Sequence, residues 1–444
     1  MLKKFLYLGL LAPLHAQDPL SVRDAVRIAL DHNKSIQAAA AGRQAAGARV
    51  NQAKSGWLPR LNYSESVTRS DNPVFVFGSL LTQHQFTENN FDLGALNQPN
   101  ALNNFQSQLS FDQTIYDAGQ LRHATRSAGL MQSVSGEEGR RTEQDVITGV
   151  VSAYCAVVLS GENLAAAKEA VRSAEADLKR AEAVRAAGMS TDVDVLSIRV
   201  HLAAVTEQQI RRAADLDVAR AALNDVLGLP LDTVHSLTTA LAPTDVPDIS
   251  LEQYERKAVD ERPEAREAKL ATSLSETQAS AARSNLLPQV GFHAAIEEDR
   301  QQFAGRAGGN WLASVSVRWN LFNGFGDKAR IEETGHLLRR SRAEEERASS
   351  AIRLEVRRAW ADLRAATQRI EVARAAVEEA QESLRITQNR YAGGLNNVTD
   401  LLRNETAVLE AKTRYLAAIN DQRVAGAMLE RAAGTLSPDS EVLN

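Results

Sequence analysis

Apolar and polar residues alternate with a period of two in four stretches of this chain. In the clearest stretch one face carries Trp311, Ala313, Val315, Val317, Trp319 and Leu321, and the other carries Leu312, Ser314, Ser316, Arg318 and Asn320. An apolar face, a polar face and a length of about ten residues are typical of a transmembrane β-strand. The alternation predicts strands at about 58–69, 105–116, 287–299 and 311–322. One face of a soluble β-sandwich is the alternative that the pattern alone leaves open.

Two other stretches are predicted to form very long helices. Residues 119–187 and 325–393 each span 69 positions without a proline. At 1.5 Å per residue each helix would be about 100 Å long, which suits a coiled coil or a tube of helices rather than a compact domain. Apolar residues step by three and four along both: Leu164, Ala167, Val171, Ala174, Leu178 and Ala181, then Ile370, Ala373, Val377, Ala380 and Leu384. Shorter helices are predicted at about 192–228 and 398–433.

The whole pattern occurs twice. Gly188 and Gly394 lie 206 positions apart, as do Asp194 and Asp400, whereas Pro59 and Pro288 lie 229 positions apart. The first half therefore carries an insertion of 23 residues between Pro59 and Phe111. We predict one repeat at 17–229 and another at 249–434, joined by a linker at 230–248 and followed by a polar tail at 435–444.

Each repeat is expected to start with one helix and to continue with its two strands. Ser21-x-x-Asp24 and Ser250-x-x-Gln253 are capping boxes, from which the first helices run toward Gly56 and Asn285. The insertion, within about Asn72–Asn104, is expected to form an extracellular loop that packs over the mouth of a membrane barrel formed by the strands. Four aromatic residues make that loop apolar: Phe75, Phe77, Phe86 and Phe91.

The first sixteen residues resemble a secretory signal. Lys3 and Lys4 precede the mostly apolar stretch 5–14, and Ala16 is a small residue at the expected cleavage site. The formal net charge is −5, which argues against a nucleic-acid partner. The single cysteine, Cys155, excludes an intramolecular disulfide and is read as a small packing residue.

Residues that could carry catalysis or bind a metal are scattered. The eight histidines lie far apart and form no H-x-x-x-H pair, and the Gly324-Phe325-Gly326 segment lacks the third glycine of a dinucleotide motif. We therefore expect no catalytic residues, no metal ligands and no cofactor, and hence no enzyme.

Four membrane strands per chain cannot close a barrel, because open strand edges are not tolerated in hydrocarbon and the smallest barrels have about eight strands. The strand count therefore requires two or three chains. A membrane barrel continued by a tube of long helices would form a conduit across the bacterial envelope.

The duplicated order, with Tyr391-Ala-Gly-Gly394-Leu and Asp400-Leu-Leu402 in the second turn, resembles the TolC family of outer-membrane efflux and secretion channels. The resemblance covers about Leu20 to Gly434. It implies a mainly α fold with a homotrimeric twelve-stranded membrane β-barrel, continued by a long α-helical periplasmic tunnel. It also implies a passive exit duct of a tripartite efflux or type I secretion system, in contact with outer-membrane lipid. A periplasmic adaptor (membrane fusion) protein and an inner-membrane pump are the implied partners, and the cargo stays open.

The resemblance also assigns roles to single residues. Gly188, Gly393 and Gly394 fall in the turns that adaptors grip. Asp400 matches an acidic ring at the entrance constriction, and Tyr391 and Asp194 match hydrogen-bonding partners that hold the entrance shut. Two positions depart from the family pattern: Asn396 replaces a gate-locking arginine, and Arg403 replaces a second ring aspartate. The resemblance thus implies an entrance that is held less tightly and is less selective for cations.

A second function class competes with the duct. A trimeric coiled-coil stalk or adhesin with a small membrane anchor would also use long helices and membrane strands. Such a stalk needs neither a duplicated unit nor glycine turns at matching offsets, so the duplication favours the duct.

Overall fold

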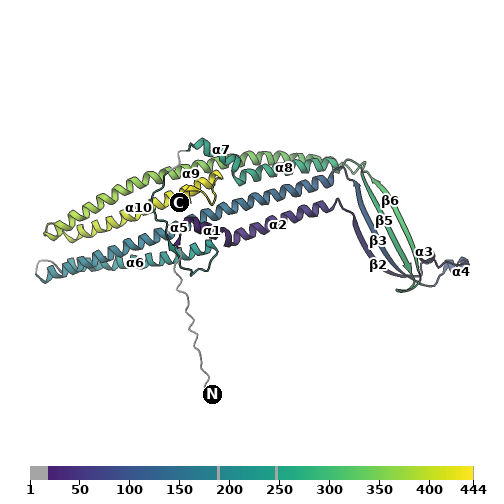
Figure 1. Cartoon of the computed structure of the whole chain (residues 1–444), viewed down its shortest axis with the longest axis horizontal. Coiled ribbons are helices and arrows are strands. Elements are labelled where there is room, and N and C mark those ends of the chain that lie inside the picture. Colours follow the sequence, from purple (N-terminus) through teal and green to yellow (C-terminus); the bar gives the residue numbers. More distant parts are fainter. Residues whose placement is uncertain (1–18, 188–190, 246–248, 444) are drawn as a thin grey trace, which may run out of the picture. The chain divides into compact units, whose positions relative to one another are not determined.

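A computed structural model describes residues 19–187, 191–245 and 249–443. The predicted signal peptide and Gly188 lie outside these residues. The chain divides into two compact units (Figure 1). Unit 1 comprises the N-terminal segment up to Gly42, then Gly136–Glu267 and Glu346–Asn444, and unit 2 comprises Arg43–Ser135 and Ala268–Glu345.

Two matching series of helices and strands build the chain. The first series is α1 (Val22–His32), α2 (Lys34–Ser55), β2 (Arg60–Ser70), β3 (Leu102–Tyr116), α5 (Gln120–Ala186) and α6 (Asp192–Leu227). The second is α7 (Leu251–Glu261), α8 (Pro263–Ser284), β5 (Gln289–Arg300), β6 (Ala307–Arg318), α9 (Gly326–Ala392) and α10 (Val398–Ala433). Both α5 and α9 have 67 residues, and both α6 and α10 have 36.

The expectation of a single helix before the strands is wrong in both halves. The helix is split at Asn33 in the first half and at Arg262 in the second, where the backbone is extended. Arg262 precedes Pro263, whose ring disfavours a helical conformation at the residue before it. The Asn33 side chain donates to Val226 O at 2.8 Å and accepts from Ser35 N at 2.8 Å, which holds the first break. The two predicted caps, Ser21 and Ser250, are confirmed.

Glycines end α6 and α10 where these helices meet the two breaks. Gly228 and Gly434 adopt left-handed backbone conformations with φ of 73° and 75°. A Cβ on Gly228 would lie 2.7 Å from His32 O, and one on Gly434 would lie 2.6 Å from Arg262 Cα. Only glycine combines this conformation with so close an approach of two backbones.

The buried residues in the core of unit 1 repeat with the same 206-residue spacing as the sequence duplication. Buried residues 206 positions apart occupy equivalent places: Val146 and Ile352, Val150 and Val356, Val157 and Leu363, and Leu223 and Leu429. Cys155 is 3% exposed within the first cluster, which confirms its packing role. Leu436 and Leu443 are also buried there, so the C-terminal residues pack into the core rather than forming a merely polar tail.

A short parallel pairing joins the start of the first repeat to the segment between the repeats. Here β1 (Pro19–Leu20) pairs with β4 (Ser236–Leu237). The buried Tyr154 hydroxyl donates to Leu20 O at 2.8 Å and accepts from Thr239 N at 2.9 Å. One phenol therefore ties both segments to α5.

Among the described residues, α5 is the one helix with an 18-residue window apolar enough to cross a membrane, with a mean hydropathy of 1.4. Its apolar residues Ile147, Val150, Val151 and Tyr154 are at most 2% exposed and belong to the core of unit 1. Of this window 33% is buried inside the chain, in keeping with a helix that packs in a core.

A four-stranded antiparallel sheet forms the main part of unit 2, in the order β2-β3-β5-β6. The register places apolar residues in rows across the sheet, such as Leu61, Phe111, Ala294 and Ala313, and then Tyr63, Leu109, Ile296 and Trp311. Rows of the opposite face are polar, such as Ser64, Gln108, Glu297 and Asn310. The predicted alternation is confirmed, and it extends over all four strands.

The inserted segment contains short helices where a loop was expected. They are α3 (Pro73–Thr82), η1 (Glu88–Phe91) and α4 (Leu93–Asn97), which lie at one end of the sheet (Figure 1). Asn72 caps α3 and Pro73 occupies its first turn, a favourable start for a helix. Buried Gln83 donates to Asn104 Oδ1 at 2.8 Å, and Asn104 donates to Asp299 Oδ1 at 2.6 Å. The end of α3 is thereby anchored to the polar face of the sheet.

Candidate functional site

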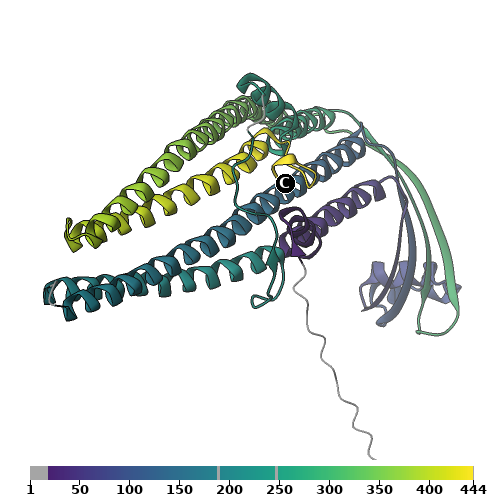
Figure 2. The same ribbon diagram turned by 60° about the vertical axis from the view of Figure 1, so that its left-hand side comes forward.

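The candidate site lies where two helical hairpins end. The α5/α6 and α9/α10 pairs run side by side within unit 1 in both views (Figures 1 and 2). In the second turn Gly394 has a φ of +71°, and Leu395 N donates to Arg390 O at 2.8 Å. Gly393 has no left-handed φ, and a Cβ there would meet only ordinary contacts of 3.6 Å or more. Of the two glycines in this second turn, only Gly394 has a backbone conformation that requires glycine.

Asp194 and Asp400 occupy equivalent positions in the first turns of α6 and α10. Thr191 Oγ1 accepts from Asp194 N at 3.3 Å, and Asn397 Oδ1 accepts from Asp400 N at 2.8 Å. A carboxylate in the first turn interacts favourably with the helix dipole. The Asp400 side chain is 40% exposed and its Oδ1 lies 3.9 Å from Arg403 Nη1. The Asp400 carboxylate therefore stabilises the start of α10 and is also accessible to solvent near the end of the hairpin.

Tyr391 connects the two hairpins. It packs against buried Ala181, Val195, Ile198 and Val398, which come from α5, α6 and α10. Burial raises the pKa of the Tyr391 phenol, and the charge of Asp194 adds to this effect. The Asp194 carboxylate thus lies close enough to act on the Tyr391 phenol, and the hydrogen bond that the resemblance implies stays a prediction.

Asn396 forms its described hydrogen bond within the α9/α10 hairpin and not with the α5/α6 hairpin. Its Oδ1 accepts from Arg390 Nε at 2.9 Å, so this contact stays within the second turn. The position at which the family has a gate-locking arginine therefore stabilises the turn itself.

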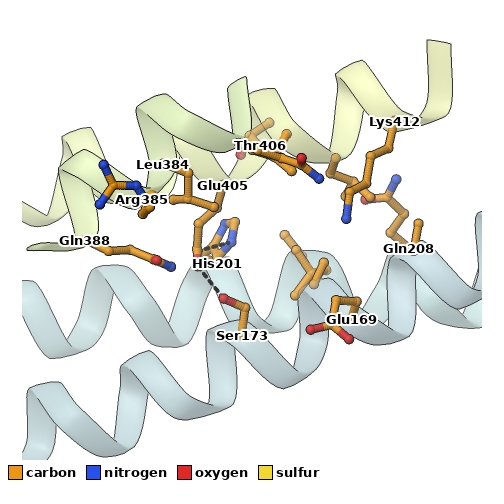
Figure 3. Close-up of a pocket in the computed structure, with 17 residues that line it drawn as sticks. Glu169, Ser173, His201, Gln208, Leu384, Arg385, Gln388, Glu405, Thr406 and Lys412 are labelled. Carbon is orange, nitrogen blue, oxygen red and sulfur yellow. Dashed lines mark hydrogen bonds and ion pairs between the residues drawn. The ribbon is translucent and has the colours of Figure 1, made fainter. Parts of the chain in front are cut away.

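Sequence reasoning missed a polar contact between the hairpins farther from the tip. Glu405 on α10 lies against Ser173 on α5 and His201 on α6, as the dashed lines in Figure 3 show. Asp177 on α5 is 4% exposed and lies within hydrogen-bonding reach of Glu405. The one available signal was that Asp177 follows the seam residue Ala174 by three positions. Charged residues are so frequent along these helices that this signal does not stand out.

The sheet of unit 2 has one apolar and one polar face. Trp311, Val315 and Val317 on the apolar face are 80%, 64% and 68% exposed in the single chain. On the polar face His293 Nδ1 lies 2.7 Å from Asp112 Oδ1. Within the described residues β2 and β6 each pair along one edge only. Both outer edges therefore remain available to strands of other chains.

Comparison with known proteins identifies the family. The family model of outer membrane efflux proteins matches residues 25–229 and 256–435. The chain belongs to this family. It is a transport protein of the bacterial outer membrane, with the fold of TolC-type channels and a helical tunnel in the periplasm. The predicted family, TolC-type fold and location are thereby confirmed, whereas the homotrimeric twelve-stranded barrel stays a prediction.

Individual relatives are distant but match over nearly their full length. Protein CyaE of Bordetella pertussis is 26% identical over 433 residues, which cover 96% of this chain and 86% of that protein. The alkaline protease secretion protein AprF of Pseudomonas aeruginosa is 22% identical over 424 residues, covering 94% and 85%. The crystal structure of a membrane protein from Pseudomonas aeruginosa matches with a TM-score of 0.81 at 20% identity and covers 93% of both chains. The last comparison shows the shared fold alone.

Proposed function

We propose that three copies of this outer-membrane channel protein form one exit duct. The observation that carries this proposal is the four-stranded sheet with an apolar face and a polar face, whose two outer edges pair with no other strand among the described residues. Pairing β6 of one copy with β2 of the next leaves no open edge in the membrane. Three copies give twelve strands, in keeping with the barrel that the resemblance implies.

The duct carries cargo that an inner-membrane pump and a periplasmic adaptor deliver to its helical tips. One relative is named for secretion of alkaline protease and another for export of pyoverdine, so both polypeptides and small molecules fit this family. The adaptor contacts the turns that contain Gly188, Gly393 and Gly394. Their repetition in both hairpins gives the adaptor two similar binding places per chain.

The same tips form the entrance constriction. Threefold symmetry would place three Asp400 carboxylates around one axis, each with Arg403 on the next turn of its helix. Tyr391 and Asp194 contribute to holding the hairpins together, whereas Asn396 supports the second turn. Because Arg403 lies near each carboxylate, attraction of cations is weaker than it would be for aspartates alone.

The segment from α3 to α4 covers the extracellular mouth of the barrel. Its anchor on the polar face of the sheet supports this placement, because that face lines the barrel interior. Val74, Phe91 and Leu93 are 81%, 66% and 74% exposed in the single chain. In the trimer these apolar side chains meet their counterparts from the neighbouring copies.

The mass of the detergent-solubilised protein tests the assembly. Native mass spectrometry should give one species of three chains. A control variant places proline within β6, Val315→Pro, where it would interrupt the strand. That variant should yield monomers. A stable wild-type monomer, or a closed dimer, would contradict the proposed trimer.

A further inference from the structure

The buried contact between the two hairpins is more than a single hydrogen bond. Ser173 Oγ donates to Glu405 Oε1 at 2.8 Å, and His201 Nε2 lies 3.3 Å from Glu405 Oε2. The Glu405 side chain is 8% exposed and that of His201 is 14% exposed. Figure 3 shows Glu405 reaching from α10 toward both residues. One carboxylate thus joins three helices of unit 1.

Asp177 is the fourth member of this cluster. It places a second buried carboxyl group beside Glu405, so the stability of the cluster depends on whether a proton is bound. Asp177 Oδ2 is buried and has no hydrogen-bond donor among the described residues, whereas His201 Nε2 lies 3.3 Å from Glu405 Oε2. Two neighbouring buried carboxylates repel each other, and oxygens without a donor are costly to bury. A proton held between the two carboxyl groups removes the repulsion and supplies one donor. The geometry therefore favours a singly protonated Asp177–Glu405 pair.

Other charged groups surround this pair. On α5 these are Glu169 and Arg180, whose Nη1 lies 3.8 Å from Asp177 Oδ1. Further charged or titratable groups come from α6, α9 and α10: His201, Asp194, Arg385, Tyr391 and Lys412. Arg180 and His201 oppose protonation of Asp177, but burial and the neighbouring Glu405 outweigh them.

The cluster also borders a cavity between the hairpins. The cavity has a volume of about 430 Å³, and its lining includes Ser173, His201 and Glu405. Small and aliphatic side chains such as Ala170, Ala204 and Leu409 form much of the remaining lining. The polar contact at Glu405 therefore holds the hairpins together in a region where apolar packing is incomplete.

We propose that Glu405, Asp177 and His201 form a proton-dependent lock that holds the α9/α10 hairpin against the α5/α6 hairpin and so keeps the periplasmic entrance closed. This inference rests on the proposed gated duct. It assigns the locking role to residues of the hairpin flanks, since Asn396 at the tip binds within its own turn.

The direction of the pH effect follows from the two carboxyl groups. Burial, together with the hydrogen bond and charge of Glu405, raises the pKa of Asp177 to about 7. Burial also acts to raise the pKa of Glu405, but hydrogen bonds from His201, Asp177 and Ser173 outweigh it and hold that pKa below its usual range. The closed arrangement thus binds a proton that the separated hairpins release. Closure is favoured below neutral pH and loses this advantage as the pH rises through about 7.

The size of the effect can be stated in advance. We take a pKa of about 7 for Asp177 in the closed arrangement and its ordinary value of 3.8 after separation. The ratio of closed to open hairpins then falls roughly tenfold per chain between about pH 6 and pH 8.

Distances between spin labels test this lock without relying on transport. Nitroxides at exposed Val200 on α6 and Ile386 on α9 report the separation of the hairpins. In the wild-type channel the population with the longer distance should rise from about pH 6 to pH 8. Asp177→Asn supplies a permanent donor to Glu405, so it should remain closed over this range. Glu405→Gln removes the negative charge next to Asp177, so its spin-label distances should also be independent of pH. The same result in two different variants guards against a folding defect in Asp177→Asn.

Glu207→Gln is the matched control, because Glu207 is an exposed carboxylate on α6 whose ion pair with Arg211 lies outside the cluster. It should respond to pH as the wild type does. A wild-type distance that is independent of pH, or an Asp177→Asn variant that follows the wild type, would overturn the lock. A pH-dependent distance in a protein that conducts no ions would refute the proposed duct and leave the lock in place.

Discussion

The glycines at the ends of α6 and α10 provide a sharp test of how unit 1 is held together. In Gly228→Ala the new Cβ would lie 2.7 Å from His32 O, at a residue whose φ is +73°. A left-handed conformation costs a non-glycine residue about 1–2 kcal/mol. Relief of the backbone overlap adds about 1–3 kcal/mol, as in other overpacked sites. The stability of unit 1 should therefore fall by roughly 2–5 kcal/mol.

Gly434→Ala should behave in the same way, because its φ is +75° and its Cβ would lie 2.6 Å from Arg262 Cα. Gly139→Ala is the matched control within α5, where a Cβ meets nothing within 4 Å. Alanine in an open helical position stabilises by about 0.5–1 kcal/mol relative to glycine. The substitution from glycine to alanine should thus have opposite signs at Gly139 and at the two helix ends.

Thermal unfolding of the detergent-solubilised protein, followed by circular dichroism, measures both effects. Midpoints should be compared at one protein concentration, because the stability of an oligomer depends on concentration. The midpoint should fall for Gly228→Ala and Gly434→Ala, and it should rise slightly for Gly139→Ala. Equal midpoints for Gly228→Ala and Gly139→Ala would refute the close approach of α6 to the break after His32.

Three further predictions concern other parts of unit 1. Tyr154→Phe removes the partner of Thr239 N, whereas Leu20 O keeps its hydrogen bond from Thr238 N, so the same melting experiment should show a loss of about 1–3 kcal/mol. Gly394→Ala should weaken adaptor binding in a pull-down with the purified adaptor, whereas Gly393→Ala, which requires no left-handed φ, should bind as the wild type does. Asp400→Ala channels should be blocked less by a trivalent cation than wild-type channels, with the trimer intact; equal block in both would place Asp400 away from the constriction.

The regular elements of this fold could be predicted because their signals are local and repeated. Alternation with a period of two located the strands, and the absence of proline located α5 and α9. The 206-residue spacing that revealed the duplication also relates buried core residues such as Val150 and Val356. Repetition strengthened each signal, since a chance pattern rarely occurs twice in the same order.

Two details were missed although the sequence contained a signal for them. Pro263 disfavours a helical conformation at Arg262, whereas a single helix was expected from the cap at Ser250 toward Asn285. Likewise, Asn72-Pro73 is a good helix start within a segment that was expected to be a loop.

The contact between the hairpins could not be predicted from a single sequence. Asp177, His201 and Glu405 are separated by up to 228 positions and come from three helices. Asp177 and His201 have no charged counterparts in the other repeat, because the positions 206 away from them are Ser383 and Ala407. Only tertiary packing shows that these charges are buried together.

Conductance in planar lipid bilayers tests the central claim, that this chain forms a transmembrane duct, most directly. Purified trimers should insert and produce discrete current steps, which follow from the closed barrel and its polar lining. The Val315→Pro protein, unable to close the barrel, should produce none. Wild-type trimers that insert into the membrane but carry no current would contradict the duct and favour the coiled-coil stalk.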